Sequence, residues 1–365
     1  MEHRKNWLVL CLTAGFLFVF SLWNILKPDI ALSESERRAL AQKPALNASS
    51  LWDGSFMESF EAYTLDQFPL RDAFRSLKAH VQLDLLRQKD NNGIYVAGGY
   101  AAKLDYPASE DSIRHALSRF NRIYEKYLQG AETAVYFSAI PDKNYFLAAE
   151  YGYPAIDYAA FARTFTDEMP YATPIDLTDT LTLDSYYRTD IHWRQEMLLP
   201  AAQRLADTMG IPLRDTYETV MLDTPFYGVY CGQSALNLAP DTLRYLTNAA
   251  LQACTVYDYE TDTTLPVYDL AAAQSSDAYA LFLSGSKSLL TIENPNATTD
   301  RELVIFRDSF ASSLAPLLAE GYAKITLVDI RYLSPERLGT WLTFTDQDVL
   351  FLYSTPVLNN SETIK

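Results

Sequence analysis

The chain has 365 residues, enough for one large domain or two modest ones. Hydrophobic residues make up 48% of it and charged residues 21%, a balance typical of a folded globular protein and not of a disordered one. The formal net charge of −16 argues against a nucleic-acid-binding protein, which needs clustered lysine and arginine.

The N-terminal segment predicts a membrane anchor. Residues 7–26, WLVLCLTAGFLFVFSLWNIL, carry no charge, and a helix of this length rises about 30 Å, the thickness of a hydrocarbon core. His3, Arg4 and Lys5 precede it, and the positive-inside rule holds such an end in the cytoplasm. A cleavable signal peptide is the alternative, but no small-x-small cleavage site follows. We therefore expect a single-pass protein of the cell membrane, with a cytoplasmic tail (1–6), a transmembrane signal anchor and an extracytoplasmic remainder.

The segment after the anchor predicts an arm followed by a large domain. Residues 27–50 are polar and contain two prolines, which is typical of a loop. We expect a juxtamembrane arm over 27–65 and an extracytoplasmic domain over 66–365, with a loop-rich insertion at about 215–285, where Tyr, Thr and Asp are frequent. Apolar residues at helical spacing predict an amphipathic helix over 70–86.

From about residue 109 onward, helical patterns alternate with short apolar strands. Strands that are apolar on both faces and separated by helices are typical of a parallel sheet that helices cover on both sides. The sequence therefore predicts an α/β fold with a mainly parallel central sheet. The predicted strands are 134–140, 302–306, 324–330 and 348–354, and the predicted helices are 111–130, 194–210 (interrupted by Pro200) and 311–322.

One of the four histidines stands in a context suited to catalysis. His192 lies in the segment YYRTDIHW, two residues after Asp190. An aspartate that accepts the Nδ1 proton of an imidazole leaves Nε2 to act as a base. His3 lies beside the membrane, whereas His80 and His115 fall in predicted helices outside any acidic motif. His192 is therefore the candidate base and Asp190 the candidate orienting acid; an ordinary buried polar pair is the alternative.

The nucleophile that such a base would serve is sought at the end of a strand. The predicted strand 302–306 runs into RDSFASS and then a helix, so Ser309 lies at the carboxyl end of a strand, where ligands bind in open α/β sheets. Amide groups at the start of the helix could stabilise an oxyanion. The alternative is that Ser309 or Asp308 only caps the helix, because both residue types are favoured there.

Metal and disulfide chemistry receive little support from the sequence. There is no Cys/His cluster with zinc spacing, and a metal at Asp190 and His192 would need further ligands that the neighbouring sequence does not offer. We therefore expect no metal. A disulfide between Cys231 and Cys254 could form outside the cytosol, but spacing alone does not establish it.

Two longer segments, YYRTDIHW and RDSFASSLAPLLAEGYAKITLVDIRYL, resemble the bacterial DHHW family of surface proteins. That family is similar to the alginate O-acetylation proteins, which have a permuted SGNH-hydrolase-like fold. The resemblance therefore implies an SGNH-hydrolase-like, three-layer fold. It covers most of the chain, because it extends to SESERRALAQKP (33–44), DQFPLRDAF (66–74) and NNGIYVAGG (91–99).

The resemblance also implies roles for individual residues. The Asp and the His before the Trp of the family motif fall on Asp190 and His192, and the family's Asp-Ser pair falls on Asp308 and Ser309. The relatives' nucleophile would then be Ser309, their base His192 and their orienting acid Asp190. Arg331 corresponds to an arginine that could bind the substrate or the oxyanion; a surface arginine at a strand end is the alternative.

The sequence departs from the family pattern in two places. The first His of the Asp-His-His-Trp motif is Ile191 here, which leaves Asp-x-His intact. In FLSGSKS, residues 282–288, a Gly-Gly-Asn-like turn is missing; if that turn helps to build an oxyanion hole, its absence weakens the case for full activity.

The resemblance implies a polysaccharide O-acetyltransferase of the cell surface that works through a Ser-His-Asp acyl-enzyme. Its acetyl donor would be supplied by a membrane-bound O-acyltransferase partner, and no soluble cofactor would be needed. Two alternatives stay open. The same triad could pass the acetyl group to water, which gives an esterase, or the protein could be a non-catalytic polysaccharide-binding protein whose many tyrosines form the contact surface.

Overall fold

The computed structural model describes residues 2–213 and 216–365. The chain divides into two compact units: unit 1 comprises Met1–Asn92 and Cys231–Asn237, and unit 2 comprises Gly93–Tyr230 and Leu238–Lys365. The start of the expected insertion at residue 215 lies outside the described residues, as does Met1 of the expected cytoplasmic tail. The expected domain boundaries stay a prediction.

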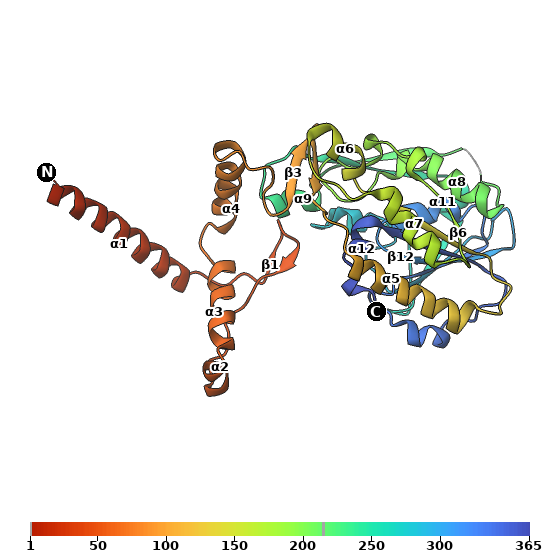
Figure 1. The fold of residues 1–365 in the computed structure, drawn as a ribbon, viewed down its shortest axis with the longest axis horizontal. Helices are drawn as coiled ribbons and strands as arrows, with labels where there is room; N and C mark the ends of the chain where they lie inside the picture. Colours follow the sequence, from red (N-terminus) through yellow and green to blue (C-terminus); the bar gives the residue numbers. More distant parts are fainter. Residues whose placement is uncertain (1, 214–215) are drawn as a thin grey trace. The chain divides into compact units, whose positions relative to one another are not determined.

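The N-terminal helix of unit 1 has the properties expected of the anchor. Helix α1 (Glu2–Leu26; Figure 1) is long and apolar enough to cross a membrane. Its apolar side chains are largely exposed along its length. Such exposure is costly in water but favourable in lipid. The helix is thus compatible with a single-pass anchor.

The rest of unit 1 consists of short elements held by ion pairs. Arg38 contacts Asp66 at 2.6 Å, and Arg71 contacts Glu36 at 2.5 Å, so two of the segments that resemble the DHHW family lie against each other. The bond from Arg38 is the main cause that lowers the pKa of the Asp66 carboxyl to about 2. The elements are β1 (Leu32–Ser33), β2 (Arg38–Ala39), α2 (Ala48–Trp52), α3 (Ser55–Asp66), α4 (Arg71–His80) and the π-helical turn η1 (Val81–Leu85).

Unit 2 is built on a mainly parallel sheet. Within the described residues this sheet has eight strands in the order β10-β9-β11-β13-β12-β14-β5-β6. The five strands from β13 to β6 are parallel, whereas β10, β9 and β11 join antiparallel at one edge. The strands are β5 (Val135–Ile140), β6 (Thr173–Pro174), β9 (Thr255–Asp258), β10 (Thr263–Leu265), β11 (Leu289–Glu293), β12 (Glu302–Arg307), β13 (Lys324–Val328) and β14 (Asp348–Ser354).

Helices cover both faces of this sheet and bury it (Figure 1). Apolar residues of α8 (Leu199–Met209) and α11 (Ala311–Leu318) pack into the core on one face, and those of α5 (Glu110–Ile123), α7 (Tyr158–Glu168) and α12 (Thr355–Asn359) pack into the core on the other. The expected three-layer α/β fold with a mainly parallel central sheet is confirmed. The remaining helices and strands are β3 (Ile94–Ala97), β4 (Tyr100–Lys103), α6 (Asn144–Tyr151), β7 (Glu218–Phe226), α9 (Val229–Ser234), β8 (Asp241–Thr247) and α10 (Ala249–Ala253).

One predicted helix begins later than expected. The pattern over 194–210 predicts a helix that Pro200 interrupts, but α8 begins only at Leu199, with Pro200 in its first turn. Proline is tolerated there because the first N–H groups of a helix have no partner within it. The preceding residues instead form a short 3-10 turn, Gln195–Met197.

Candidate active site

The segment YYRTDIHW forms a closed loop, here called the Asp-His loop (residues 186–193). Tyr186 pairs with Trp193 in an isolated antiparallel bridge, and the Tyr187 amide donates to the carbonyl oxygen of His192 at 3.1 Å. The buried Trp193 indole N–H contacts the carbonyl oxygen of Phe310 and the hydroxyl of Ser313, both at 2.9 Å. The tryptophan thereby joins the loop to the first turn of α11.

The loop brings together three residues that the sequence singles out. Nδ1 of His192 lies 2.6 Å from Oδ1 of Asp190, and Nε2 lies 2.7 Å from Oγ of Ser309. A carboxylate only accepts hydrogen bonds, so the ring nitrogen beside it donates and Nε2 is left to accept the hydroxyl proton of Ser309. The Asp190 side chain is 1% exposed and that of His192 13%. The arrangement has the connectivity of a Ser-His-Asp triad.

The side chain of Asp308 accepts the backbone hydrogen bonds at the turn where α11 begins. Its carboxylate accepts the Phe310 amide at 3.0 Å, and the amide and hydroxyl of Ser354 both at 2.7 Å. Asp308 is fully buried, whereas Ser309 is partly exposed at the carboxyl end of β12. Asp308 therefore stabilises the turn, whereas the hydroxyl of Ser309 contacts His192.

Backbone groups from a distant segment hold the Asp190 carboxylate, and the sequence gives no sign of them. Oδ2 of Asp190 accepts the Val229 amide at 2.8 Å, and the Gly228 amide donates to the Thr189 hydroxyl at 2.9 Å. A Cβ atom on Gly228 would lie 2.3 Å from the carbonyl oxygen of Thr189 and 2.4 Å from the nitrogen of Asp190. Only glycine allows this approach.

An aromatic ring supports the imidazole. The ring of Tyr279 stacks on that of His192 with centroids 3.8 Å apart and an interplanar angle of 5°. Its hydroxyl donates to Ser313 at 2.8 Å, and burial raises its pKa far above the ordinary value of a tyrosine. Tyr279 therefore stays neutral, and the face of its ring packs against the imidazole and supports its orientation.

Arg331 lies in an ion pair close to the end of β13. Its Nε and Nη2 contact the carboxylate of the buried Asp329 at 2.9 Å and 2.6 Å. The carboxyl ends of β13 and β12 lie at the same sheet edge, because the two strands are parallel neighbours. The expected contact of Arg331 with the substrate or the oxyanion stays a prediction.

The turn expected to bear on the oxyanion hole has an unusual backbone. Leu283, Ser284 and Gly285 all have positive φ angles, of 55°, 56° and 86°. The Ser284 hydroxyl donates to Asp269 at 2.8 Å. The chain thus turns sharply at the place where a Gly-Gly-Asn-like turn is missing from the sequence.

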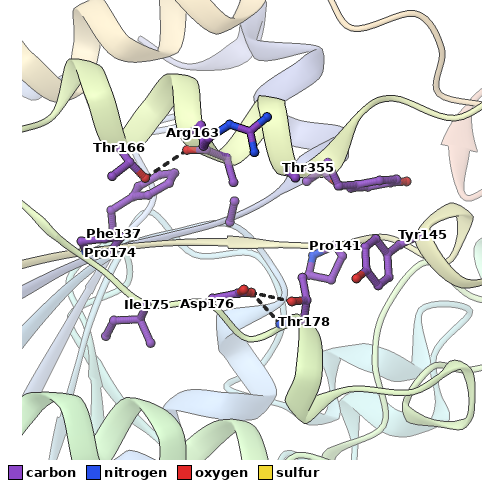
Figure 2. Close-up of a pocket in the computed structure, with 14 residues that line it drawn as sticks. Phe137, Pro141, Tyr145, Arg163, Thr166, Pro174, Ile175, Asp176, Thr178 and Thr355 are labelled. Atoms are coloured by element: carbon purple, nitrogen blue, oxygen red, sulfur yellow. Dashed lines mark hydrogen bonds between the residues drawn. The ribbon is translucent and has the colours of Figure 1, made fainter.

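A separate cavity of about 450 Å³ lies elsewhere in unit 2. Figure 2 shows it between α7 and the edge of the sheet formed by β5 and β6, with Tyr145 and Thr355 at one end and Asp176 accepting bonds from Thr178. Asp190, His192 and Ser309 are not among its lining residues. This cavity and the Ser-His-Asp cluster are therefore distinct features.

Two further features concern candidate metal ligands and a buried thiol. Residues 2–213 and 216–365 contain no group of three or more His, Cys, Asp or Glu side chains that could hold a metal. The Cys254 thiol, in place of a disulfide bond, contacts the carbonyl oxygen of Ala250 at 3.4 Å, and burial raises its pKa to about 11.

Solved structures that are similar to this chain include a member of the DHHW family. No protein-family model and no curated protein matches the sequence. A DHHW family protein from Eubacterium siraeum is 23% identical, with a TM-score of 0.62 over 75% of this chain and 95% of that one. PatB1 of Bacillus cereus, solved with a sulfonyl adduct, is 19% identical, with a TM-score of 0.58 over 74% and 96%. The O-acetyltransferase domain of Pseudomonas putida AlgJ is more distant, at 15% identity and a TM-score of 0.42 over 73% and 92%. The likeness to the DHHW family is thereby confirmed, and about three quarters of the chain shares its fold with the first two of these structures.

Proposed function

We propose that this protein is a membrane-anchored, extracytoplasmic O-acetyltransferase that modifies hydroxyl groups of a cell-surface polysaccharide through an acyl-enzyme on Ser309. The observation that carries the proposal is the unbroken chain of short contacts from Asp190 through His192 to Ser309. Nucleophile, base and orienting acid within hydrogen-bond reach are the requirement for acyl transfer through a serine. A helix-capping serine would have no need of the imidazole.

In the first half-reaction, Ser309 Oγ attacks the carbonyl carbon of the acetyl donor while Nε2 of His192 takes the hydroxyl proton. The Asp190 carboxylate stabilises the imidazolium that results, and the stacked ring of Tyr279 keeps the imidazole in its orientation. When the tetrahedral intermediate collapses, the bond to the leaving group breaks. The leaving group takes the proton from His192, and Ser309 carries the acetyl ester.

In the second half-reaction, a sugar hydroxyl gives its proton to Nε2 of His192 and attacks the acetyl carbonyl. The ester bond to Ser309 breaks, and the proton returns to Oγ. No step needs an oxidant, a metal or a soluble cofactor. Helix α1 would hold the site near the membrane, where a membrane-bound O-acyltransferase partner would supply the acetyl donor, and the net charge of −16 suits a polysaccharide better than a nucleic-acid acceptor.

The test uses the full chain in detergent micelles with p-nitrophenyl acetate as the donor, with and without acceptor oligosaccharides. We expect p-nitrophenolate release, an increase in protein mass by one acetyl group, and acetylated oligosaccharide. Ser309→Ala removes all three, whereas Ser118→Ala, which changes an exposed serine of α5, removes none. Turnover with wild-type rate in Ser309→Ala would refute the proposal. Release of acetate with every acceptor would show that the second half-reaction uses water.

A further inference from the structure

A buried lysine lies directly under the Asp-His loop. Lys143, between β5 and α6, is 2% exposed. Burial of an ammonium group costs free energy unless its protons find partners. Its Nζ lies 3.0 Å from the carbonyl oxygen of Tyr187, 3.3 Å from that of Arg188 and 2.8 Å from that of Asp190. The ammonium group thus donates hydrogen bonds to three main-chain carbonyl oxygens of the Asp-His loop.

These three contacts have a geometric consequence for the loop. An ammonium group has three donors, and here three carbonyl oxygens of the four-residue stretch 187–190 converge on it. Carbonyl oxygens that point at one place repel one another without a cation between them, and buried ones lose their hydrogen bonds with water. The face of the Tyr230 ring, 4.8 Å from Nζ, adds a cation–π contact from another segment. The loop conformation therefore depends on the charge at its centre.

Asp190 connects the Lys143 ammonium group to the candidate catalytic residues. The carbonyl oxygen of Asp190 contacts Lys143, and its carboxylate contacts His192 and the amide of Val229. Both ends of Asp190 are thereby held, one by the lysine and one by the backbone of another segment. A displacement of the main chain at Asp190 would move the carboxylate away from Nδ1 of His192.

We propose that Lys143 is a positioning residue: its buried ammonium ion gathers the carbonyl oxygens of the Asp-His loop and so fixes Asp190 and His192 in the geometry that activates Ser309. The proposal rests on the proposed acyl-transfer function and adds a residue that touches neither substrate nor reacting atoms. Lys143 acts on the site through its contacts with the loop.

The experiment measures pre-steady-state acetylation of Ser309 by p-nitrophenyl acetate in the full chain, separating the maximal acylation rate from the ester concentration that gives half of it. In Lys143→Met, which keeps an unbranched side chain one atom shorter and removes the charge, we expect the maximal rate to fall about 100-fold, the effect of a displacement of about 1 Å in an active site. The half-saturating concentration should change less than about twofold, because the ester does not contact the lysine. Lys143→Arg, which keeps a cation, should retain more activity than Lys143→Met, and the exposed Lys126→Met should match wild type.

Each outcome bears on a different claim. Wild-type acylation by a folded Lys143→Met, with Ser309→Ala inactive, overturns the positioning role and leaves the proposed function intact. Turnover that persists in Ser309→Ala overturns the proposed function itself. If Lys143→Met does not fold, Lys143→Gln replaces it, since it keeps two N–H donors without charge; a wild-type rate in that variant would likewise overturn the role of the ammonium ion.

Discussion

The two halves of the candidate active site are built in different ways. Ser309 follows a buried strand and precedes a helix, and the bonds at this turn are mostly short in sequence, such as Phe310 to Asp308 and Ser312 to Ser309. Most of the Asp-His loop has no regular secondary structure, and its partners are Lys143, Val229 and other residues dozens of positions away. The nucleophile is thus placed by local structure and the base by tertiary contacts.

This difference predicts where distant substitutions act. A change outside the site leaves the turn at Ser309 intact, because the parallel strands on both sides of β12 fix it. The Asp-His loop, in contrast, should be displaced by substitutions in the segments that contact it. Substitutions in the Asp-His loop and around it should therefore have large effects, and we order them from the largest to the smallest.

Asp190→Asn should have the largest effect. The amide keeps the shape of the carboxyl group but can donate to Nδ1 of His192, which leaves the wrong tautomer facing Ser309. We expect the acylation rate to fall about 10⁴-fold with the fold retained. Stopped-flow release of p-nitrophenolate measures the rate, and Asp111→Asn, on the exposed face of α5, is the matched control. A loss below about tenfold would contradict the role of Asp190.

Asp142→Asn should change how stability depends on pH. Asp142 is 6% exposed, and burial raises the pKa of its carboxyl to about 7, although the bond from Tyr158 opposes this. The folded protein therefore keeps a proton that the unfolded chain loses from about pH 4 upward. This contribution to stability is complete below about pH 4 and is lost as the pH rises through 7.

The variant cannot ionise and so lacks this loss. Relative to wild type, we expect its free energy of unfolding to gain up to about 4 kcal/mol between pH 4 and pH 8. Urea unfolding followed by tryptophan fluorescence at several pH values provides the measurement. A difference between the two proteins that stays constant with pH would contradict the raised pKa of Asp142.

Gly228→Ala should damage the loop from a distance. The added methyl group would overlap the peptide between Thr189 and Asp190, so the chain at Val229 must move and its bond to the carboxylate weakens. We expect about a 100-fold slower acylation and about 1–3 kcal/mol lower stability. Gly339→Ala, whose Cβ would meet only Tyr127 at an ordinary 3.4 Å, is the control. Normal rates in Gly228→Ala would show that the loop does not depend on this contact.

Tyr279→Leu should have the smallest effect of the four. The stacked ring holds the imidazole of His192 in place by about 1 kcal/mol, so its loss should slow acylation about fivefold. Tyr279→Phe keeps the ring and loses only the bond to Ser313, which lowers stability by about 1 kcal/mol and leaves the rate within about threefold. Equal rates for the leucine and phenylalanine variants would exclude a role for stacking.

The sequence predicts those strands whose hydrophobic residues form a clear local pattern. The strands at 134–140, 302–306, 324–330 and 348–354 have clear hydrophobic patterns and appear as β5, β12, β13 and β14. The predicted start of α8 was wrong because a proline is compatible with two places in a helical pattern. It can interrupt a helix, or it can lie in the first turn of one. Periodicity cannot distinguish them.

The candidate site could be predicted only where its residues carry a local motif. Asp190 and His192 lie two positions apart, and Ser309 follows a strand, so the sequence indicates all three. Lys143, Gly228, Val229 and Tyr279 act across 36 to 87 positions of chain when measured from His192. Nothing near them in the sequence suggests their contact with the loop, and for Val229 only a backbone amide is used.

The most direct test of the account is the site and rate of labelling by an alkyl sulfonyl fluoride, mapped by peptide mass spectrometry. A sulfonyl fluoride reacts with a serine that a neighbouring base activates. We expect one label on Ser309 in the wild-type chain and almost none over the same time in His192→Ala or Asp190→Asn. Labelling of another residue, or labelling of Ser309 at the same rate in His192→Ala, would contradict it.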